Sequence, residues 1–243
     1  AERARVARIA VEHAGATPVF VGVGDLRTSR VLAHVDSAQK AGAAGVLLAP
    51  MTYQPLTDDD VYELFRIVTE HTGLPVIVYD NPDTTHFTFT LELYARIAEL
   101  PGVVSIKIPG VPAAPDTARE HVMAVRGAIP EHVTIGVSGD ALAATGLNAG
   151  CDAWYSVIGG TLPAHALSIT RAAQAGWTQE AVAESRRLAP LWDLFAELGG
   201  SLRVIAAIAE YLGLVPPSCL PIRGLNRSQR VRVSDVVVEL GLA

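Results

Sequence analysis

The chain has 243 residues, of which 50% are hydrophobic and 6% aromatic, and it carries a formal net charge of −6. A chain of this length can bury one large core, so we expect a single α/β domain. The basic residues are scattered, which argues against a surface for nucleic acid or anionic lipid, and no apolar run approaches the roughly 20 residues that span a bilayer. We therefore expect a cytoplasmic protein that binds a small molecule, with neither nucleic acid nor a membrane as partner.

Disulfide and metal chemistry find no support in the sequence. The two cysteines, Cys151 and Cys219, are too few for a disulfide framework and lie far from metal-ligand spacing. The seven histidines show no ligand spacing either. We expect both cysteines to be buried apolar residues, and we expect no metal and no cofactor.

Short apolar runs rich in β-branched residues recur along the chain, most of them roughly 30 residues apart, as is typical of buried parallel strands. Helical patterns lie between them, and the fifth connection is short but still holds about two helical turns. Beyond residue 158 only helical stretches follow. The expected strands are 18–24, 45–50, 75–80, 103–108, 133–138 and 153–158, and the later helical stretches are 163–175, 178–198, 200–213 and 227–241.

Alternating strands and helices form either an open doubly wound sheet or a closed barrel. No Gly-x-Gly-x-x-Gly or P-loop pattern follows the first strand, which favours a (β/α)8 TIM barrel with a C-terminal helical extension over an open sheet. The chain opens inside an amphipathic helical pattern, and six strands do not complete eight, so we expect the first two βα units to precede residue 1. Residues 1–160 would then form the third to eighth barrel strands, and residues 161–243 the last barrel helix and the extension.

Lys107 is the most informative residue of the sequence. The chain has only two lysines, Lys40 on a helical surface pattern and Lys107 inside the strand VVSIKI, where a charge is costly to bury. Strand alternation puts Val103, Ser105 and Lys107 on one face, and Lys107 lies near the carboxyl end, where barrel active sites are built. Partial burial favours the free amine, which is the species that attacks a carbonyl. A strand-end lysine that snorkels to solvent or forms a salt bridge is the alternative.

Tyr79 ends the preceding strand in the segment PVIVYDNP. In a barrel its ring would lie beside Lys107, and a phenol can pass protons to and from a carbinolamine or a departing oxygen. The Asp-Asn-Pro that follows is a turn signal, which places Tyr79 at the mouth of the barrel. The alternative is a tyrosine packed at a strand end with its hydroxyl bonded locally.

Three motifs occur in order: YDNP, then SIKIPG, then GVSGDALAATGLNAGCDAWYSV. Together they resemble the dihydrodipicolinate synthase/N-acetylneuraminate lyase family of class I pyruvate-dependent aldolases, whose motifs read roughly Tyr-Asn-x-Pro, Gly-Ile-Lys, Ser-Gly-Asp and Gly-x-x-Ser-Val. The likeness runs from about residue 18 to the end. It implies that Lys107 forms the Schiff base and Tyr79 relays protons, and it suggests a homo-oligomer, a tetramer or a dimer. It also implies that the pyruvate end of the pocket is lined by Ser138, Gly139, Tyr155 and Ser156.

Departures from the family pattern fall in the pocket for the second substrate. Met51 and Thr52 stand where the synthases carry a Tyr-Tyr pair, and Thr84 stands where they carry an arginine beyond the proline. Thr52 and Thr84 therefore become candidate substrate-binding residues. Thr85 and His86 follow and offer a hydroxyl and an imidazole, which would suit a hydroxylated substrate. The Gly-Thr-Thr-Gly-Glu segment of the family, which binds the pyruvate carboxylate, is absent.

Two other features have simpler interpretations. The DDD run at residues 58–60 opens a helical pattern, where carboxylates favour the helix dipole, so we interpret it as a helix start and not as a metal site. Trp154 and Tyr155 end the last strand, and core packing is the simple alternative for both.

The sequence thus predicts a lyase that acts on pyruvate or a related 2-keto acid through a Schiff base, with an aldehyde as a possible second substrate. One alternative is the 4-hydroxy-tetrahydrodipicolinate synthase of lysine biosynthesis. A second, from another class, is a non-catalytic homologue that binds a keto acid. The second substrate and the direction of reaction stay open.

Overall fold

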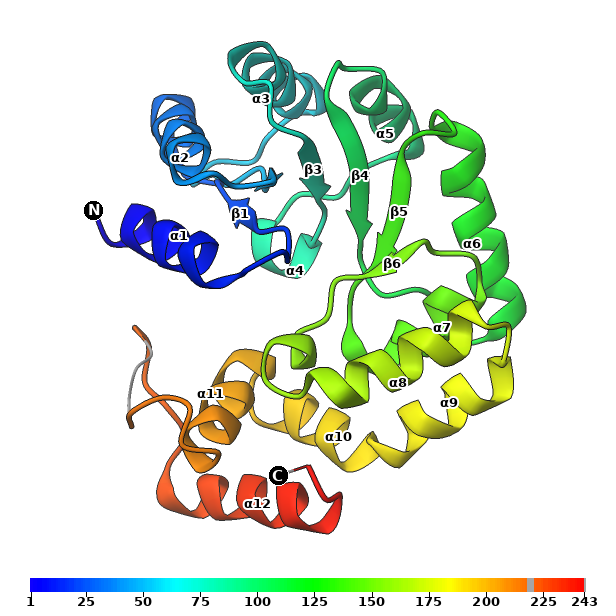
Figure 1. The fold of residues 1–243 in the computed structure, drawn as a ribbon. Coiled ribbons are helices and arrows are strands. Elements are labelled where there is room, and N and C mark those ends of the chain that lie inside the picture. The colour runs from blue at the N-terminus through cyan, green and yellow to red at the C-terminus, as the bar shows by residue number, and fades with distance from the viewer. Residues whose placement is uncertain (218–220, 243) are drawn as a thin grey trace. The chain divides into compact units, whose positions relative to one another are not determined.

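The computed structural model describes residues 1–217 and 221–242 of the chain (Figure 1). In this part of the chain six strands form one sheet, in which they follow one another in sequence order, as the repeated strand–helix pattern predicts. The pairs from β1 to β4 are parallel. The strands are β1 (Phe20–Gly22), β2 (Gly45–Leu48), β3 (Val76–Tyr79), β4 (Val103–Ile108), β5 (Thr134–Val137) and β6 (Ala153–Trp154).

Helices follow the strands, and their ends carry the expected capping groups. At the start of α3 the Thr57 hydroxyl accepts from the Asp60 N–H at 3.2 Å, and the Asp60 carboxylate accepts from the Thr57 N–H at 2.9 Å. The DDD run is therefore a capped helix start, as predicted. The helices are α1 (Glu2–His13), α2 (Thr28–Ala41), α3 (Asp58–His71), α4 (Pro82–Thr85), α5 (Leu91–Ala98), α6 (Pro115–Ala128), α7 (Ala143–Asn148), α8 (Pro163–Gln174), α9 (Thr178–Arg187), α10 (Ala189–Glu197), α11 (Ser201–Tyr211) and α12 (Arg227–Glu239), with 3-10 turns η1 (Asp140–Leu142) and η2 (Ile158–Gly160).

The chain divides into two compact units, and the first comprises residues 1–109, 120–136 and 151–153. It holds β1 to β4, with α2, α3 and α5 along the strands (Figure 1). Apolar side chains from strands and helices form its core, because β-branched strand residues and one stripe of each helix leave water together. Fully buried members include Val35, Leu48, Phe65, Val78, Leu93 and Ile106.

The second unit comprises residues 110–119, 137–150 and 154–243 and is mainly helical. Helix α8 packs against α7 and α9, and α11 packs against α10 and α12. Its fully buried side chains include Ile158, Ile169, Leu188, Leu191 and Ile208.

Two expected element boundaries are wrong. The run 153–158 is a strand only at Ala153–Trp154, because the Asp140 carboxylate accepts from the N–H groups of Val157 and Ile158, at 3.0 and 2.9 Å, and turns the chain into η2. The stretch 178–198 is two helices, since Pro190 lies in the first turn of α10, and a proline lacks the N–H that would continue the preceding helix.

Of the two cysteines, Cys151 is buried, as expected, whereas Cys219 lies outside the described residues. None of the helices formed by residues 1–217 and 221–242 has the length and apolar character needed to cross a membrane. The two βα units expected before residue 1, and the boundary between residues 160 and 161, stay predictions.

Candidate active site

Lys107 and Tyr79 meet at the carboxyl ends of neighbouring strands. In the parallel register of β3 and β4, Tyr79 is the direct partner of Lys107. The Lys107 Nζ lies 4.1 Å from the centroid of the Tyr79 ring, which is a cation–π distance. The two side chains that the sequence predicts to work together are therefore adjacent.

Burial distinguishes Lys107 from an ordinary surface lysine. Lys107 is only 7% exposed, so its side chain does not snorkel to solvent. Val103 and Ser105, which share its face of the strand by alternation, are buried as well. Lys40, the other lysine, is exposed on α2, as expected. This burial sets Lys107 apart from a solvated surface lysine, and the neutral amine is the form of a lysine that attacks a carbonyl.

The Tyr79 hydroxyl is oriented by the turn that follows β3. The Asn81 side-chain amide donates to the Tyr79 hydroxyl oxygen at 3.2 Å (Nδ2 to Oη). This bond uses an acceptor lone pair and leaves the hydroxyl proton for transfer. A local hydrogen bond to the Tyr79 hydroxyl is thus compatible with a proton relay.

The segment after Asn81 exposes some candidate side chains and buries another. Thr84 and His86 are exposed, and His86 has a φ of 56°, in the left-handed region. Thr85 is 3% exposed, and its hydroxyl donates to the Asn81 carbonyl at 3.0 Å. The expectation that Thr85 offers a hydroxyl to substrate is wrong, because that hydroxyl closes the turn.

Asp80 is a buried acid beside the lysine strand that the sequence predictions did not single out. It is 4% exposed, and its backbone N–H donates to the Lys107 carbonyl at 3.0 Å. The Tyr94 hydroxyl donates to its Oδ2, while its buried Oδ1 has no hydrogen-bond partner. Burial raises the pKa of Asp80 to about 6, against the opposing effects of the Tyr94 hydrogen bond and the Lys107 charge. The aspartate in YDNP, where the family motif reads asparagine, was the available signal.

The Ser-Gly-Asp motif forms a tight turn after β5. Ser138 is buried, and Gly139 has a φ of 80°, a conformation that favours glycine. Asp140 is 4% exposed and accepts from the Trp154 indole N–H at 3.1 Å, in addition to the two backbone bonds that end β6. Asp140 therefore links the motif to the Trp154–Ile158 segment, a role that the sequence predictions missed.

Tyr155 and Ser156 lie in the segment that Asp140 holds, and both are half-buried. The Tyr155 N–H donates to the Val137 carbonyl at 2.9 Å, and the Ser156 hydroxyl oxygen accepts from the Gly159 N–H at 2.9 Å. The bond of Tyr155 thus places the Tyr155–Ser156 segment beside Val137, the residue before Ser138. The part of these residues in pyruvate binding stays a prediction.

Comparison with known proteins identifies the family. A family model described as the dihydrodipicolinate synthetase family matches residues 1–240. The chain belongs to this family. A dihydrodipicolinate synthase structure from Agrobacterium tumefaciens superposes with a TM-score of 0.91 at 40% identity, covering 98% of this chain and 80% of that one. The protein is therefore a lyase with the (β/α)8 barrel fold of the dihydrodipicolinate synthetase family, of which the described residues supply six strands.

Curated relatives carry more than one name. A 4-hydroxy-tetrahydrodipicolinate synthase from Gluconacetobacter diazotrophicus is 30% identical over 246 residues, which cover 99% of this chain and 80% of the relative. An uncharacterized DapA-like lyase from Halobacterium salinarum is 29% identical over 248 residues, which cover 99% of this chain and 77% of the relative. Membership of the dihydrodipicolinate synthetase family does not by itself fix the second substrate.

Thr52 belongs to the first unit and lines a cavity whose lining includes neither Lys107, Tyr79 nor Thr84. It lines a cavity of about 500 Å³ together with Met51 and Thr28, and its hydroxyl oxygen accepts from the Gln54 N–H at 3.1 Å. The carboxylates of Asp25, Asp59 and Glu63 border the same cavity. Its role in substrate binding stays a prediction.

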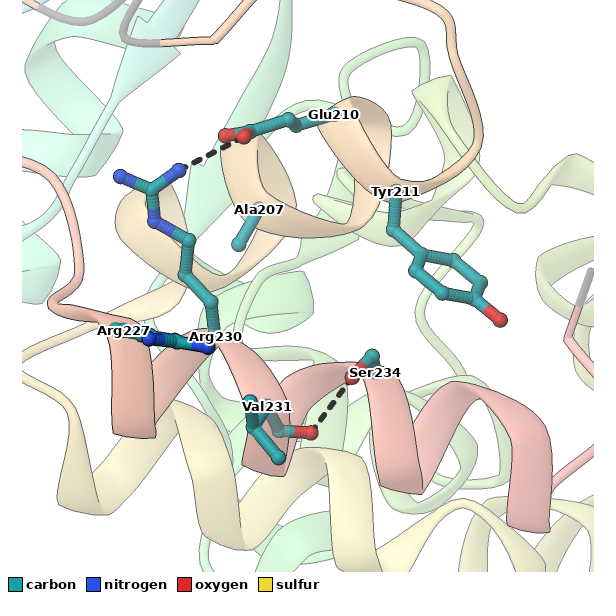
Figure 2. Close-up of a pocket in the computed structure, with 7 residues that line it drawn as sticks. All are labelled: Ala207, Glu210, Tyr211, Arg227, Arg230, Val231 and Ser234. Carbon is teal, nitrogen blue, oxygen red and sulfur yellow. Dashed lines mark hydrogen bonds and ion pairs between the residues drawn. The ribbon is translucent and has the colours of Figure 1, made fainter.

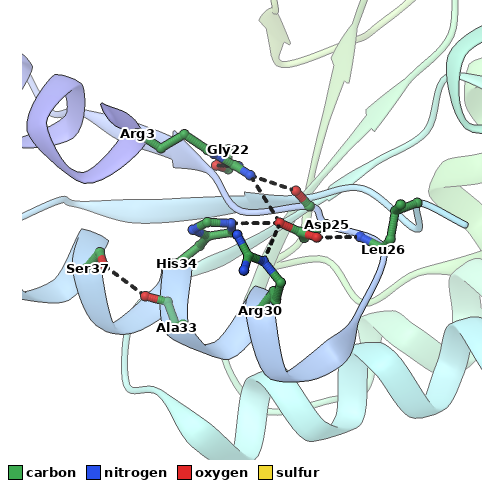
Figure 3. Close-up of polar contacts among 9 residues, drawn as sticks. Arg3, Gly22, Asp25, Leu26, Arg30, Ala33, His34 and Ser37 are labelled. Atoms are coloured by element: carbon green, nitrogen blue, oxygen red, sulfur yellow. Dashed lines mark hydrogen bonds and ion pairs between the residues drawn. The ribbon is translucent and has the colours of Figure 1, made fainter. Parts of the chain in front are cut away.

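A cluster of charged side chains covers the carboxyl end of β1 (Figure 3). The Asp25 carboxylate lies 2.9 Å from His34 Nε2, and Arg30 and Arg3 lie within 3.8 Å of it. The hydrogen bond from His34 is the main cause that holds the pKa of Asp25 below its usual value. Arg3 also donates to the Gly22 carbonyl at 2.7 Å. This cluster therefore joins α1 and α2 to the strand end, which is a structural task.

A cavity of about 530 Å³ lies between α11 and α12 (Figure 2). Arg230 donates to Glu210 at 2.7 Å, and the Ser234 hydroxyl donates to the Val231 carbonyl at 2.7 Å. Among the described residues that line this cavity, none pairs a nucleophile with a base. Lys107 and Tyr79 remain the stronger candidates for chemistry.

Proposed function

We propose that this member of the dihydrodipicolinate synthetase family is a class I aldolase or lyase that forms a Schiff base between Lys107 and pyruvate or a related 2-keto acid. The observation that carries the proposal is a buried amine 4.1 Å from the ring of Tyr79, at the carboxyl ends of two parallel strands. The membership of a lyase family supports the same assignment.

The reaction begins when the neutral Lys107 amine attacks the C2 carbonyl carbon and forms a carbinolamine. The carbinolamine oxygen then leaves as water after protonation, and the nitrogen keeps a positive charge as an iminium ion. When the C3–C4 bond breaks, this cation accepts the electron pair of that bond and becomes an enamine; when the bond forms, the enamine donates the pair from C3 and the iminium ion returns. Tyr79 passes protons to and from the substrate oxygen, because its hydroxyl is held by Asn81 and keeps a transferable proton. Ser138, Gly139, Tyr155 and Ser156 are assigned to the pyruvate end by the family motifs.

The second substrate is proposed from Thr84. An arginine binds a carboxylate with two charge-assisted hydrogen bonds, whereas the exposed Thr84 offers one neutral hydroxyl. Replacing the arginine contact by the threonine contact costs about 2 kcal/mol of binding free energy, or roughly thirtyfold in affinity. We therefore expect poor turnover of aspartate semialdehyde and better turnover of hydroxylated substrates such as 2-keto-3-deoxy sugar acids or 4-hydroxy-2-keto acids. An arginine from elsewhere, such as the exposed Arg27, or one from a neighbouring subunit of a tetramer or dimer, would restore the contact.

The alternative is a 4-hydroxy-tetrahydrodipicolinate synthase, which the relatives of that name favour. Steady-state assays of the full-length protein with pyruvate plus aspartate semialdehyde, beside the sugar acids and hydroxy keto acids, distinguish the two. A much higher kcat/KM for aspartate semialdehyde than for the others assigns the synthase activity. A keto acid that binds without any turnover assigns the non-catalytic homologue.

The Schiff base itself is tested by borohydride reduction in the presence of pyruvate. Peptide mass spectrometry assigns the adduct to one lysine, because Lys40 and Lys107 lie far apart in the sequence. We expect a reduced adduct on the peptide that contains Lys107, its loss in Lys107→Ala, and its retention in the matched control Lys40→Ala. An adduct confined to Lys40, or none on the full-length protein, contradicts the proposal.

Tyr79→Phe tests the proton relay while keeping the ring that contacts Lys107. We expect kcat to fall about a hundredfold, the lower range for loss of a general acid–base, with little change in pyruvate binding. Trapping by borohydride at long times should still occur. Equal losses in kcat and in pyruvate affinity would instead assign Tyr79 to binding.

A further inference from the structure

We propose that Asn81 is a positioning residue for the proton relay. Its side-chain amide sets the direction of the Tyr79 hydroxyl and stabilises the negative charge on that oxygen once the proton has left. This role rests on the proposed function, because Asn81 acts through Tyr79. Asn81 stands at the start of α4, yet its side chain bonds to Tyr79 instead of capping that helix.

Asn81 occupies the N-cap position of α4, where asparagine is preferred because its side-chain oxygen usually accepts from an N–H of the first turn. Within Asn81–Thr85, all of which the structure describes, the Asn81 side chain makes no such bond. Its amide instead donates to the Tyr79 hydroxyl oxygen at 3.2 Å. At α12, by contrast, the Asn226 side-chain oxygen accepts from the Gln229 N–H at 3.0 Å and caps the helix. Capping therefore does not account for the side chain of Asn81.

The backbone of Asn81 is held in place by the turn that it opens. The Asn81 carbonyl accepts from the N–H groups of Thr84 and Thr85, at 3.0 and 2.9 Å, and from the Thr85 hydroxyl at 3.0 Å. Thr85 is 3% exposed, so water competes little for its hydroxyl. Tyr79 is fixed from its own side, as the last residue of β3 and the register partner of Lys107. The amide therefore needs little reorganisation to reach the hydroxyl.

The direction of this hydrogen bond decides where the proton of Tyr79 can go. An amide N–H only donates, so the Tyr79 oxygen accepts through a lone pair and its own O–H stays available for another acceptor. The Lys107 Nζ, on which the carbinolamine forms in the proposed reaction, lies 4.1 Å from the centroid of the Tyr79 ring. Tyr79 gives its proton to the carbinolamine oxygen, which leaves as water with the electron pair of its C–O bond while the nitrogen lone pair forms the C=N bond.

The hydrogen bond from Asn81 strengthens when this proton has left. Tyr79 is then a phenolate, and a hydrogen bond to a charged acceptor is roughly twice as strong as one between neutral groups. Asn81 therefore stabilises the state after the transfer more than the state before it, which is the condition for lowering the barrier. The phenolate takes a proton back from the substrate or from water, and the relay is restored.

Two variants distinguish positioning from capping, because the two roles rank them in opposite order. Aspartate caps a helix as well as asparagine does and alanine does not, so a capping role makes Asn81→Ala the poorer enzyme. An ionised aspartate can only accept, so it would take the Tyr79 O–H and withhold its proton. We expect kcat at pH 7 to fall about a hundredfold in Asn81→Asp and about tenfold in Asn81→Ala, with little change in KM for pyruvate.

The pH profile gives a second readout, because Asn81 itself carries no charge. Protonation turns the new aspartate into a donor, so the ratio of kcat for Asn81→Asp to that for the wild type should rise as the pH falls towards about 4, the ordinary pKa of an aspartate. The ratio for Asn81→Ala should stay constant. The matched control is Asn226→Asp, which keeps its helix cap and should leave kcat unchanged at every pH.

The surroundings of position 81 are the same in both variants, so they cancel in this comparison. The titratable groups of the adjoining described elements are Tyr79 and Asp80 at the end of β3, Lys107 from β4, and the exposed Asp83 and His86 of the same segment. Asp80 is bonded by Tyr94 from α5.

The hydrogen bond can also be measured without substrate. The side-chain amide signals of Asn81 in ¹⁵N-labelled full-length protein are assigned by their absence in Asn81→Asp. They should shift in Tyr79→Phe, which removes the acceptor oxygen. The matched control is Tyr62→Phe, which removes a phenol hydroxyl from α3 and should leave the signals in place. Signals that do not move in Tyr79→Phe overturn the role of Asn81, whatever the activities.

The outcomes separate the two proposals. No borohydride adduct on Lys107 of the full-length wild-type protein overturns the proposed function, and the role of Asn81 with it. An adduct together with a kcat for Asn81→Ala equal to or below that for Asn81→Asp overturns the role of Asn81 alone. An adduct together with a lower kcat for Asn81→Asp than for Asn81→Ala, and a ratio that rises in acid only for Asn81→Asp, supports both.

Discussion

Two aspartates in this chain are equally buried but differ in the hydrogen bonds that they accept. Asp80 and Asp140 are each 4% exposed and each lies shortly beyond the carboxyl end of a strand. Asp140 accepts from Trp154, Val157 and Ile158, so both of its oxygens have donors. Asp80 accepts from Tyr94 through one oxygen, while the other is buried without a hydrogen-bond partner. Asp140 thus links two segments of the chain, whereas Asp80 keeps one buried carboxylate oxygen without a hydrogen bond.

The difference shows how burial and function are related in a protein interior. A carboxylate surrounded by donors is stabilised by them and holds the segments that provide them. A carboxylate with a buried oxygen that lacks a hydrogen bond lowers stability, and such a group with a raised pKa is a candidate for a functional role.

Asp140→Ala should give the largest loss of stability. It leaves the N–H groups of Val157 and Ile158 and the indole N–H of Trp154 without their acceptor. With about 1–3 kcal/mol for the buried donor of Ile158 and less for the two part-buried donors, we expect a loss of about 3 kcal/mol in the free energy of unfolding, measured in urea. Asp140→Asn, which retains one acceptor oxygen, should lose less. If Asp140→Ala unfolds like the wild type, these bonds do not hold the segment.

Asp80→Asn should instead raise the free energy of unfolding, by an amount that depends on pH. The pKa of Asp80 is raised from 3.8 to about 6 by burial, so the folded state disfavours the ionised form. The stability that Asp80 contributes is therefore fully present below pH 4 and is lost as the pH rises through 6. Relative to the wild type, the asparagine variant should gain about 2 kcal/mol between pH 4 and 7. Thermal unfolding at several pH values measures this gain, and a difference that is independent of pH contradicts it.

Trp154→Phe should have the smallest effect. It keeps an aromatic ring and removes only the indole N–H that donates to Asp140 at 3.1 Å. Asp140 keeps its two backbone donors, so we expect a loss of about 1 kcal/mol in the free energy of unfolding. A loss as large as that of Asp140→Ala would mean that the indole, and not the backbone bonds, carries the contribution of Asp140.

The sequence by itself determined the main features of the fold and the central pair of the candidate site. The strand VVSIKI is recognisable because one charge interrupts an apolar, β-branched run, and Tyr79 is recognisable because its strand precedes that run in a parallel order. These are local patterns, and a parallel sheet in sequence order converts them directly into neighbours. The split of the 178–198 helix was also available from the sequence, because Pro190 stands in the middle of it.

Only the tertiary structure decided how the acids are used. Asp80 and Tyr94 are 14 residues apart, and no periodic pattern joins them, because their contact depends on how α5 packs. The early end of β6 has the same kind of cause, since Asp140 takes the N–H groups that would have continued the strand. A hydrogen bond between distant segments depends on where both partners lie in space. A sequence pattern describes only the segment in which it occurs, so it does not show which distant residue is the partner.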